Sequence, residues 1–303
     1  MAGISVIIPT YNGTTRFLDR ALDSVCKQTY SDWELIIVDD ASTDNTATYI
    51  HDYVRSRGYH VHYIQRLVNG GPSAARNEGA ETAQGNFLAF LDQDDIWAPT
   101  FLEETLADLQ DTSPDVGATH TDRWDIDANG ERRTYVPTYQ PLFRYTQITH
   151  ILCRGNKCRI QGMLMKRAAF AQVKGFDEQL RSAEDEEFLV RLHQQFRVSH
   201  IPKPLYSYRV RYGGSANRET APLTVQIDNY MYRIRKQAHL CQEDPGLRKA
   251  FAAELAQLYY YHGKRAMSQR DKKTARHYFK AALQMRLSPK NLFRYIQSYL
   301  PML

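Results

Sequence analysis

Cysteine is scarce in this sequence. The 303 residues include only four cysteines, Cys26, Cys153, Cys158 and Cys241, too few and too scattered for a disulfide framework. Cys153 and Cys158 could form half of a zinc site, but the sequence offers no second half nearby. We therefore expect reduced thiols with structural roles.

Long apolar runs are also missing. The longest, such as Ile4–Pro9, has the length of a strand, whereas a membrane-spanning helix needs roughly 20 apolar residues. The first residues, MAGISVIIPTYNG, have no basic lead and no small-residue cleavage site, so they do not resemble a signal peptide. With 43% hydrophobic and 24% charged residues, the chain is not of a disordered class and can bury a sizeable core. We expect a cytoplasmic protein.

Acidic residues are rare at the C-terminal end. Residues 248–303 carry 12 lysines and arginines against 2 acidic residues, a net +10, while the first 247 residues carry 27 against 32, a net −5. A basic tail can bind nucleic acid, an anionic lipid or an acidic substrate. It can equally be a solvated surface.

The first 100 residues alternate short apolar runs with amphipathic stretches. This pattern is typical of parallel strands joined by crossover helices. It predicts strands at Ile4–Ile8, Glu34–Val38, His60–Gln65 and Asn86–Leu91, and a helix at Ser73–Ala83.

The pattern changes twice further along the chain. From about residue 114 to 212 it mixes strands at Val116–His120, Ile160–Met165 and Val198–Ile201 with a helix at Glu184–Gln195. After Pro222 it predicts helices only, at Leu223–Leu240, Leu247–Met267, Lys272–Met285 and Leu292–Leu300. This shift predicts an α/β domain over residues 1–221 and a basic helical region over residues 222–303.

Polar side chains follow each of the first four predicted strands. They stand in Pro9-Thr10-Tyr11-Asn12, in the segment 39–44, in Asn69-Gly70-Gly71, and in Asp92-Gln93-Asp94-Asp95. In sheets of this kind, ligands bind beyond the carboxyl ends of the strands. We therefore expect these four segments to meet at one edge.

The last of these segments has the pattern of a cation site. Carboxylates separated by one residue at a strand end can share a hard divalent cation, which prefers oxygen ligands. A bound cation would also relieve the repulsion between them. The alternative is an acidic turn that caps a helix beginning near Pro99.

Several ordered motifs carry a family resemblance. They are ISVIIPTYNG, LDSVCKQTYSDWELIIVDDASTDNT, NGGPSAARNEG, GNFLAFLDQDDIW, VKGFDEQLRSAEDEEFLVRL and SYRVRYGGSA. Together they resemble the inverting family 2 glycosyltransferases of bacterial surface-glycan type, over roughly residues 3–216. The resemblance implies the GT-A fold, an α/β fold with a Rossmann-like mixed sheet flanked by helices. It also implies a nucleotide-sugar-binding half at residues 1–113, an acceptor-side half at 114–221, and the basic helices as an extension.

The resemblance assigns donor-binding roles at the first two strand ends. It places Pro9, Thr10, Tyr11 and Asn12 at the donor nucleotide, with Tyr11 against the uracil ring. Stacking of this kind contributes affinity but discriminates little between bases. Asp40 is implied to accept a hydrogen bond from the uracil N–H, which would select the base. For Asp39 and Asp44 the competing interpretation is helix capping before Thr46, and for Asp44 we favour it.

The resemblance also assigns the acidic segment. Asp94 matches the family's metal-binding aspartate, and the cofactor is expected to be Mn²⁺ or Mg²⁺. Asp92 and Asp95 would support it from the ribose side of the donor, or by holding the groups around the metal ligand. Arg76 is implied to lie near the diphosphate, although a guanidinium here could simply hold the carboxylates in place.

On the acceptor side, the resemblance implies that Asp185 is the general base. A carboxylate suits this role because it takes a proton only as the sugar hydroxyl attacks. One base opposite one metal-held leaving group implies displacement with inversion. Glu184, Gln161 and Met163 would line the acceptor side. The alternatives are helix capping for the acidic pair and a place in the core for Met163.

One position departs from the family pattern. The family often has histidine where Tyr208-Arg209-Val210-Arg211 places Arg211. Arginine cannot ligate a cation, but it can pair with a phosphate. This puts strict metal dependence in doubt.

The tail resembles a single tetratricopeptide repeat through Tyr259, Gly263, Ala275, Phe279 and Ala282. One repeat cannot bury its own face. The helices are therefore expected to pack on the rest of the chain, on a second copy in a homo-oligomer, or on an anionic membrane surface.

Taken together, the patterns and the resemblance imply a metal-dependent, inverting hexosyltransferase. It would move a sugar, most simply from a UDP-sugar, to a saccharide or lipid-linked acceptor in cell-surface polysaccharide or lipopolysaccharide synthesis. No nucleic-acid partner is expected, and peripheral attachment to the inner face of the plasma membrane stays open. A sugar-phosphate nucleotidyltransferase would need a glycine-rich, lysine-bearing loop after Ile8, which is missing. A catalytically silent protein that docks partners through its helical tail is the other alternative.

Overall fold

The structure is a computed structural model that describes residues 3–13, 17–57, 60–138, 158–181, 184–210, 232, 236 and 245–285. The chain divides into two compact units, one of residues 1–151 with 156–221 and the other of residues 152–155 with 222–303. Arg211, Cys153, Cys241, the predicted helix Leu292–Leu300 and nearly all of Leu223–Leu240 lie outside the described residues.

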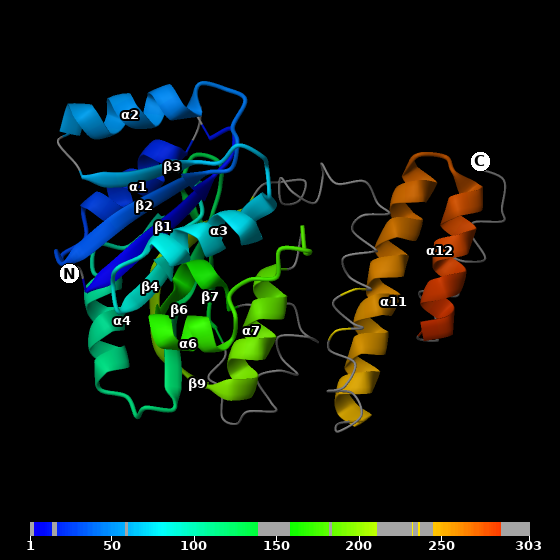
Figure 1. Ribbon diagram of the computed structural model, residues 1–303. Coiled ribbons are helices and arrows are strands. Elements are labelled where there is room, and N and C mark those ends of the chain that lie inside the picture. Colours follow the sequence, from blue (N-terminus) through cyan, green and yellow to red (C-terminus); the bar gives the residue numbers. More distant parts are fainter. Residues whose placement is uncertain are drawn as a thin grey trace. The chain divides into compact units, whose positions relative to one another are not determined.

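A mixed sheet runs through the first unit (Figure 1). In the described part of the chain it has nine strands, of which eight lie in the order β3-β2-β1-β4-β8-β6-β9-β5, with β7 paired to β6. The strands are β1 (Ile4–Thr10), β2 (Trp33–Asp39), β3 (Val61–Gln65), β4 (Phe87–Phe90), β5 (Ile96–Trp97), β6 (Val116–Ile126), β7 (Arg132–Val136), β8 (Met163–Lys166) and β9 (Arg197–Arg209).

The first four strands of the chain, β1 to β4, pair in parallel, as the alternating pattern predicts. β1 lies between β2 and β4 and is parallel to both, and β3 is parallel to β2. The side chains of Ile4, Val6, Ile7 and Ile8 have no exposed surface, since a central parallel strand is covered on both faces. The carboxyl ends of these four strands therefore meet at one edge of the sheet, where the predicted polar segments begin.

Antiparallel pairing begins at β8. This strand is antiparallel to β4 on one side and to β6 on the other, and β9 is parallel to β6. Sequence patterning predicts a strand over Ile160–Met165, but the chain forms a 3₁₀ turn, η1 (Ile160–Gly162), before β8. β9 is longer than the predicted strand Val198–Ile201. It includes Pro202 and Pro204, which cannot donate to the ladder, and its register against β6 shifts there.

Helices flank the sheet in the first unit. They are α1 (Leu18–Cys26), α2 (Thr46–Arg57), α3 (Gly71–Thr82), α4 (Phe101–Gln110), α6 (Arg167–Gln172) and α7 (Glu184–Gln195). α3 approaches β1 closely because Gly79 has no side chain. A Cβ atom at Gly79 would stand 2.5 Å from Cγ2 of Ile7. This close approach brings the start of α3 to the strand ends.

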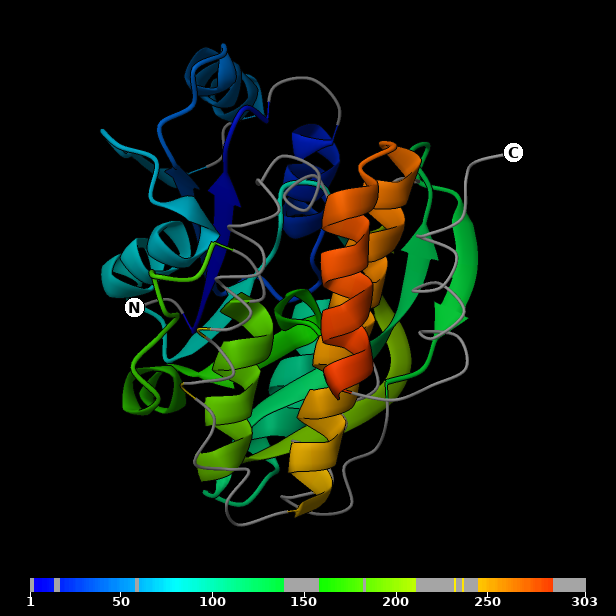
Figure 2. The ribbon, with the colours of Figure 1, turned by 90° about the vertical axis from the view of Figure 1, so that its right-hand side faces the viewer.

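The second unit contains a helical hairpin of α11 (Pro245–Ser268) and α12 (Lys272–Met285), visible in Figures 1 and 2. Phe279 is fully buried, and its ring packs directly against Gly263. A Cβ atom at Gly263 would lie 2.5 Å from that ring. Tyr259 stacks on Tyr278 with ring centroids 6.2 Å apart, while Tyr261 is 57% exposed. No helix in the described residues is both long enough and apolar enough to span a membrane.

Candidate functional site

Gln93 ties the end of β1 to the acidic segment after β4. Its side-chain oxygen accepts hydrogen bonds from Thr10 Oγ1 at 2.6 Å and from the Tyr11 amide at 3.3 Å. Its amide nitrogen donates to the Tyr11 carbonyl at 3.3 Å. Thr10 is buried, while the Tyr11 ring is 44% exposed. The bonded backbone therefore presents a partly open aromatic ring at the site, as a base-stacking role requires.

Asn12 joins the end of β1 to the loop after β2. Its backbone amide donates to Ser42 Oγ at 2.9 Å, and its side-chain oxygen accepts from the Thr43 amide at 2.8 Å. Asn12 lies in the left-handed region with φ 49°, and Ala41 does so with φ 62°. Local strain of this sort clusters at ligand sites. Asp44 accepts from the Thr46 amide at 3.0 Å, in agreement with the favoured capping role.

Asp40 is buried and holds the turn that begins α3. Its two carboxylate oxygens accept from the amides of Gly70 and Gly71 at 2.8 and 2.7 Å. Nη1 of Arg66 adds a third bond at 3.0 Å. A carboxylate has about four acceptor positions, of which the described residues use three. Besides any role at the base, Asp40 is a structural residue.

Arg76 binds two carboxylates at once. From α3, its Nη2 donates to Asp92 Oδ1 at 2.7 Å and its Nη1 donates to Glu184 Oε1 at 2.9 Å. The Arg76 side chain is 4% exposed. Burial alone would lower the pKa of this guanidinium, but Asp92 and Glu184 outweigh it and raise the pKa. The structure favours the interpretation that Arg76 holds the carboxylates in place over contact with the diphosphate.

Gln161 holds Asp92 from the other side. Its side-chain nitrogen donates to Asp92 Oδ2, and its backbone carbonyl accepts from the indole nitrogen of Trp97 at 2.7 Å. The Trp97 ring stacks on Phe101 with centroids 4.4 Å apart. Both oxygens of Asp92 are therefore engaged by protein donors. This supports the prediction that Asp92 assists the site without being the main metal ligand.

Arg209 fastens Asp94 and Asp95 from β9. Its backbone amide donates to Asp95 Oδ1 at 2.9 Å, and its Nε donates to the Asp94 carbonyl at 2.9 Å. Its Nη1 reaches the Asp127 carbonyl at 2.6 Å, and its guanidinium lies 3.9 Å from the centre of the Phe17 ring. The acidic segment is thus tied to the turn between β6 and β7.

Asp95 is a buried carboxylate with one oxygen that the described residues leave unpaired. It is 1% exposed, and its Oδ2 has no hydrogen-bond partner in the described part of the chain. Burial, reinforced by the charges of Asp94 and Asp92, raises its pKa well above the ordinary value. A divalent cation beside Asp94 and Asp95 would offset both costs. The residues fit such an ion, although no group of three His, Cys, Asp or Glu ligands stands together among the described residues.

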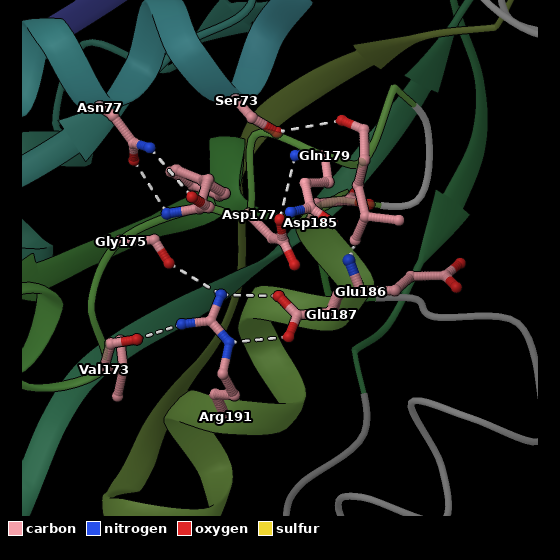
Figure 3. A network of polar contacts seen from close by, with 12 residues as sticks. Ser73, Asn77, Val173, Gly175, Asp177, Gln179, Asp185, Glu186, Glu187 and Arg191 are labelled. Atoms are coloured by element: carbon pink, nitrogen blue, oxygen red, sulfur yellow. Dashed lines mark hydrogen bonds and ion pairs between the residues drawn. The ribbon is translucent and has the colours of Figure 1, made fainter. Parts of the chain in front are cut away.

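Helix α7 carries the acidic pair and is anchored at its first turns (Figure 3). Arg191 donates to both oxygens of Glu187, at 2.8 and 2.6 Å, and to the carbonyls of Val173 and Gly175. Glu187 has no exposed surface. These bonds fix the helix against the chain that follows α6, so its N-terminus is held in place.

Glu184 and Asp185 have different surroundings at this N-terminus. Glu184 is 8% exposed, and burial raises its pKa, with Asp185 adding to the effect and Arg76 opposing it. Asp185 accepts from the Glu186 amide at 2.8 Å, and its Oδ2 lies 3.7 Å from Nη1 of Arg159. Glu184 therefore serves the carboxylate network through Arg76, whereas Asp185 is the less buried carboxylate.

Met163 does not face an acceptor directly. It lies in β8 with no exposed surface, paired to His120 of β6, so the core alternative is correct for its side chain. Its sulfur lies 3.9 Å from that of Cys158. Burial raises the pKa of the Cys158 thiol to about 12, as expected for a structural thiol. Cys158 and Cys26 are both unbridged.

Sequence reasoning missed three polar residues that hold the site, namely Arg66, Gln93 and Arg159. It expected Gln161 to line the acceptor side and did not foresee its bond to Asp92. Each of these residues lies within or beside a motif that was singled out for another residue. Their partners are distant in the chain, and no local spacing marks them. Arg209 lies in the motif SYRVRYGGSA, which by itself indicates no role for it.

The model of glycosyl transferase family 2 matches residues 5–173, more than half of the chain. The chain belongs to glycosyl transferase family 2. It is 30% identical over 221 residues to the O-antigen biosynthesis protein RfbC of Myxococcus xanthus, which covers 71% of this chain and 16% of RfbC. It is 41% identical over 103 residues to WfgD of Escherichia coli, a UDP-Glc:alpha-D-GlcNAc-diphosphoundecaprenol beta-1,3-glucosyltransferase, covering 33% of this chain and 38% of WfgD.

Solved structures confirm the predicted fold of this family 2 member. Residues 1–349 of S. aureus TarS in complex with UDP-GlcNAc match with a TM-score of 0.62 at 21% identity, covering 99% of this chain and 89% of that one. A mannosyltransferase of Pyrobaculum calidifontis in complex with GDP-Man and Mn²⁺ matches with a TM-score of 0.55 at 19% identity, covering 98% and 72%. The fold is the predicted GT-A fold. The chain spans less than two thirds of the length of RfbC and of WfgD.

Proposed function

We propose that this chain is an inverting glycosyltransferase that transfers a sugar from a UDP-sugar to a hydroxyl of a saccharide or lipid-linked acceptor. The reaction belongs to the synthesis of a surface polysaccharide such as lipopolysaccharide. The observation that carries the proposal is the guanidinium of Arg76. It bonds Asp92 beside the predicted metal ligand and Glu184 beside the predicted base, which supports a single site for both halves of the reaction.

The donor half uses the ends of β1 and β2. The half-exposed ring of Tyr11 offers a stacking surface for the base, contributing about 1 to 3 kcal/mol. The remaining acceptor position of Asp40 selects a base with an N–H at its edge. Pro9 and Asn12 shape the backbone around it. Asp94 and Asp95 would hold Mn²⁺ or Mg²⁺, which supplies Lewis-acid stabilisation of the leaving diphosphate when bound.

The acceptor half uses the N-terminus of α7. Asp185 accepts the proton of the attacking hydroxyl as its oxygen bonds to the anomeric carbon. The bond from that carbon to the diphosphate oxygen breaks at the same time, with its electron pair leaving on UDP. Attack from the face opposite the leaving group inverts the anomeric carbon. Glu184 stays in its bond to Arg76 and keeps the helix start in place.

The relatives support the substrate class. RfbC is named for O-antigen biosynthesis, the WfgD name states a UDP-Glc donor and a diphosphoundecaprenol-linked acceptor, and the TarS neighbour holds UDP-GlcNAc. A cytoplasmic enzyme that meets a lipid-linked acceptor needs access to the inner membrane surface. The exposed side chains of Lys264, Lys273, His277 and Lys280 give α11 and α12 a surface suited to anionic lipid.

Nucleotide binding decides the donor. Thermal unfolding of the full chain is followed with Mn²⁺ and UDP, GDP, CDP or dTDP. A ligand at about a hundred times its Kd adds about 2.7 kcal/mol of stability, so the midpoint rises by several degrees. We expect the rise with UDP and metal only. No rise with any nucleotide would favour the silent binding protein that docks partners through its helices.

Sugar transfer decides the mechanism. UDP-sugars that bind are incubated with the protein, and UDP release and product anomers are measured by NMR. We expect Asp185→Asn to lower kcat by about 10² to 10⁴-fold, while Asp52→Asn on exposed α2 keeps full activity. A product that retains the donor's anomeric configuration, or a fully active Asp185→Asn, would overturn the mechanism.

Vesicle binding decides the membrane contact. The full chain is sedimented with phosphatidylglycerol vesicles. We expect Lys273→Gln with Lys280→Gln to reduce binding, and Lys27→Gln with Lys174→Gln, which removes the same charge elsewhere, to leave it unchanged. Equal loss in both double variants would mean that net charge alone, and not this helix, attracts the vesicles. If neither double variant loses vesicle binding, α11 and α12 do not form the membrane contact. A second copy of the chain would then be their expected partner.

A further inference from the structure

Arg159 is the cation that the structure places against the carboxylate of Asp185. Its Nη1 lies 3.7 Å from Asp185 Oδ2. Among the described residues no other cation forms an ion pair with Asp185. The other oxygen accepts the Glu186 amide at 2.8 Å. With 17% of its side chain exposed, Asp185 has room to rotate unless a partner holds it.

Arg159 is itself held at its side chain and at its backbone. Its guanidinium lies 4.3 Å from the centre of the Tyr208 ring on β9, which is within the range of a cation–π contact. The Arg159 carbonyl accepts from the Gly162 amide at 3.1 Å, which sets the start of η1. Burial opposes its charge, but Tyr208 and Asp185 outweigh burial and raise its pKa. Arg159 is therefore a permanent cation on a fixed support.

One donor group of Arg159 is left unused by the described residues. Its Nε is buried and has no hydrogen-bond partner in the described part of the chain. Two residues further on, Gln161 bonds Asp92. The short segment 159–161 thus contacts two parts of the site. Gln161 reaches Asp92 after β4, and Arg159 reaches Asp185 at the start of α7.

We propose, on the basis of the proposed function, that Arg159 is a positioning residue for Asp185. It holds the Asp185 carboxylate in one orientation, with Oδ2 toward the guanidinium, so that the carboxylate faces the attacking hydroxyl. A base must stand within about 3 Å of the proton that it takes, and a misplacement of about 1 Å can cost about 10²-fold in rate. Arg159 acts on the rate only through Asp185.

The test is a double-mutant cycle in the full chain with Arg159→Met, Asp185→Asn and the double variant. The assay follows UDP release from UDP-glucose or UDP-N-acetylglucosamine with water as the acceptor, using whichever the wild type hydrolyses faster. We expect Arg159→Met to lower kcat by about 10 to 10²-fold, with the donor KM changed by less than about twofold. The double variant should be no slower than Asp185→Asn alone. Arg159→Lys should restore part of kcat, because the charge returns without the planar fork.

Matched controls separate this role from general damage. Arg55→Met removes an exposed arginine on α2 and should behave as the wild type. The proposal is overturned if the effects of Arg159→Met and Asp185→Asn multiply in the double variant. It is also overturned if the loss falls on donor KM, because Arg159 would then bind substrate by itself.

Failure of the proposed function is a different result. If Asp185→Asn hydrolyses the donor like the wild type, the assigned base is wrong, and if the wild type hydrolyses neither donor, the cycle gives no rates to compare. The pairing is then decided by crystal structures of the wild type and of Arg159→Met. A changed Asp185 rotamer in the variant supports the positioning role, and an unchanged Asp185 side chain overturns it.

Discussion

Arg76 Nη1 lies 2.9 Å from Glu184 Oε1, although 108 residues separate the two in the chain. The bond joins α3 to the first turn of α7. Because the same guanidinium binds Asp92, the strand end and the helix start cannot move independently. The precision of the site rests on this buried ion pair.

Removal of Arg76 should destabilise the protein strongly. Arg76→Met leaves Glu184 and Asp92 without their cation, and breaking a buried ion pair costs about 3 to 5 kcal/mol. Urea denaturation at pH 7 measures the loss. Arg55→Met should change the free energy of unfolding by less than about 0.5 kcal/mol. A loss of under about 1 kcal/mol for Arg76→Met would mean that the pair contributes no more than an exposed one.

Replacement of Asp40 should damage both the fold and the choice of base. Asp40→Ala leaves the amides of Gly70 and Gly71 unpaired, at a cost of about 1 to 3 kcal/mol. Asp40→Asn keeps one oxygen acceptor and should cost less. Isothermal titration with UDP and with CDP measures the selectivity, which we expect to fall in both variants. Unchanged selectivity with lowered stability would leave Asp40 a purely structural role.

Acid should destabilise the protein through buried histidines. Burial, with the charges of His200 and His193, lowers the pKa of His120 from 6.5 to about 3. The unfolded chain takes up this proton below about pH 6.5 while the folded chain does not, so stability is present above pH 6.5 and is lost as the pH falls toward 3. Between pH 7 and 5.5 this residue should account for about 1 kcal/mol of the loss.

His120→Gln tests the acid effect. The difference in the free energy of unfolding between pH 7 and 5.5 should be smaller in the variant by about 1 kcal/mol, as measured by urea denaturation. His51→Gln, on the exposed face of α2, should show the wild-type difference. Identical pH dependence in His120→Gln and the wild type would contradict a buried neutral His120.

A side chain at Gly263 should loosen the helical hairpin. Its Cβ atom would lie 2.5 Å from the Phe279 ring, and overpacking of this kind costs about 1 to 3 kcal/mol. Hydrogen exchange in the full chain should show faster exchange in α11 and α12 for Gly263→Val. Ser268→Ala, at an exposed position of α11, should leave exchange unchanged. Unchanged exchange in Gly263→Val would mean that α11 and α12 accommodate the added side chain with no loss of stability.

Strong local patterns were sufficient for several elements. The helices Glu184–Gln195 and Lys272–Met285 have the predicted limits, because apolar periodicity and end residues lie within each segment. The strand predicted over Ile160–Met165 was partly wrong. There Gly162 packs against the Tyr206 ring, where a Cβ atom would lie 2.2 Å from Cε1. That contact with a distant strand favours the 3₁₀ turn, and no pattern within the segment reveals it.

The sequence by itself determined which chemical groups stand at the strand ends, since Tyr11, Asp40 and Asp94 follow apolar runs whose carboxyl ends must meet in a parallel sheet. The tertiary structure decided which groups bind one another. It paired Arg76 with Asp92 and Glu184, and Arg159 with Asp185. These pairs depend on how strands and helices distant in the chain pack together. Hydrogen bonds and charges act over a few ångströms in space, and spacing along the chain does not encode that distance.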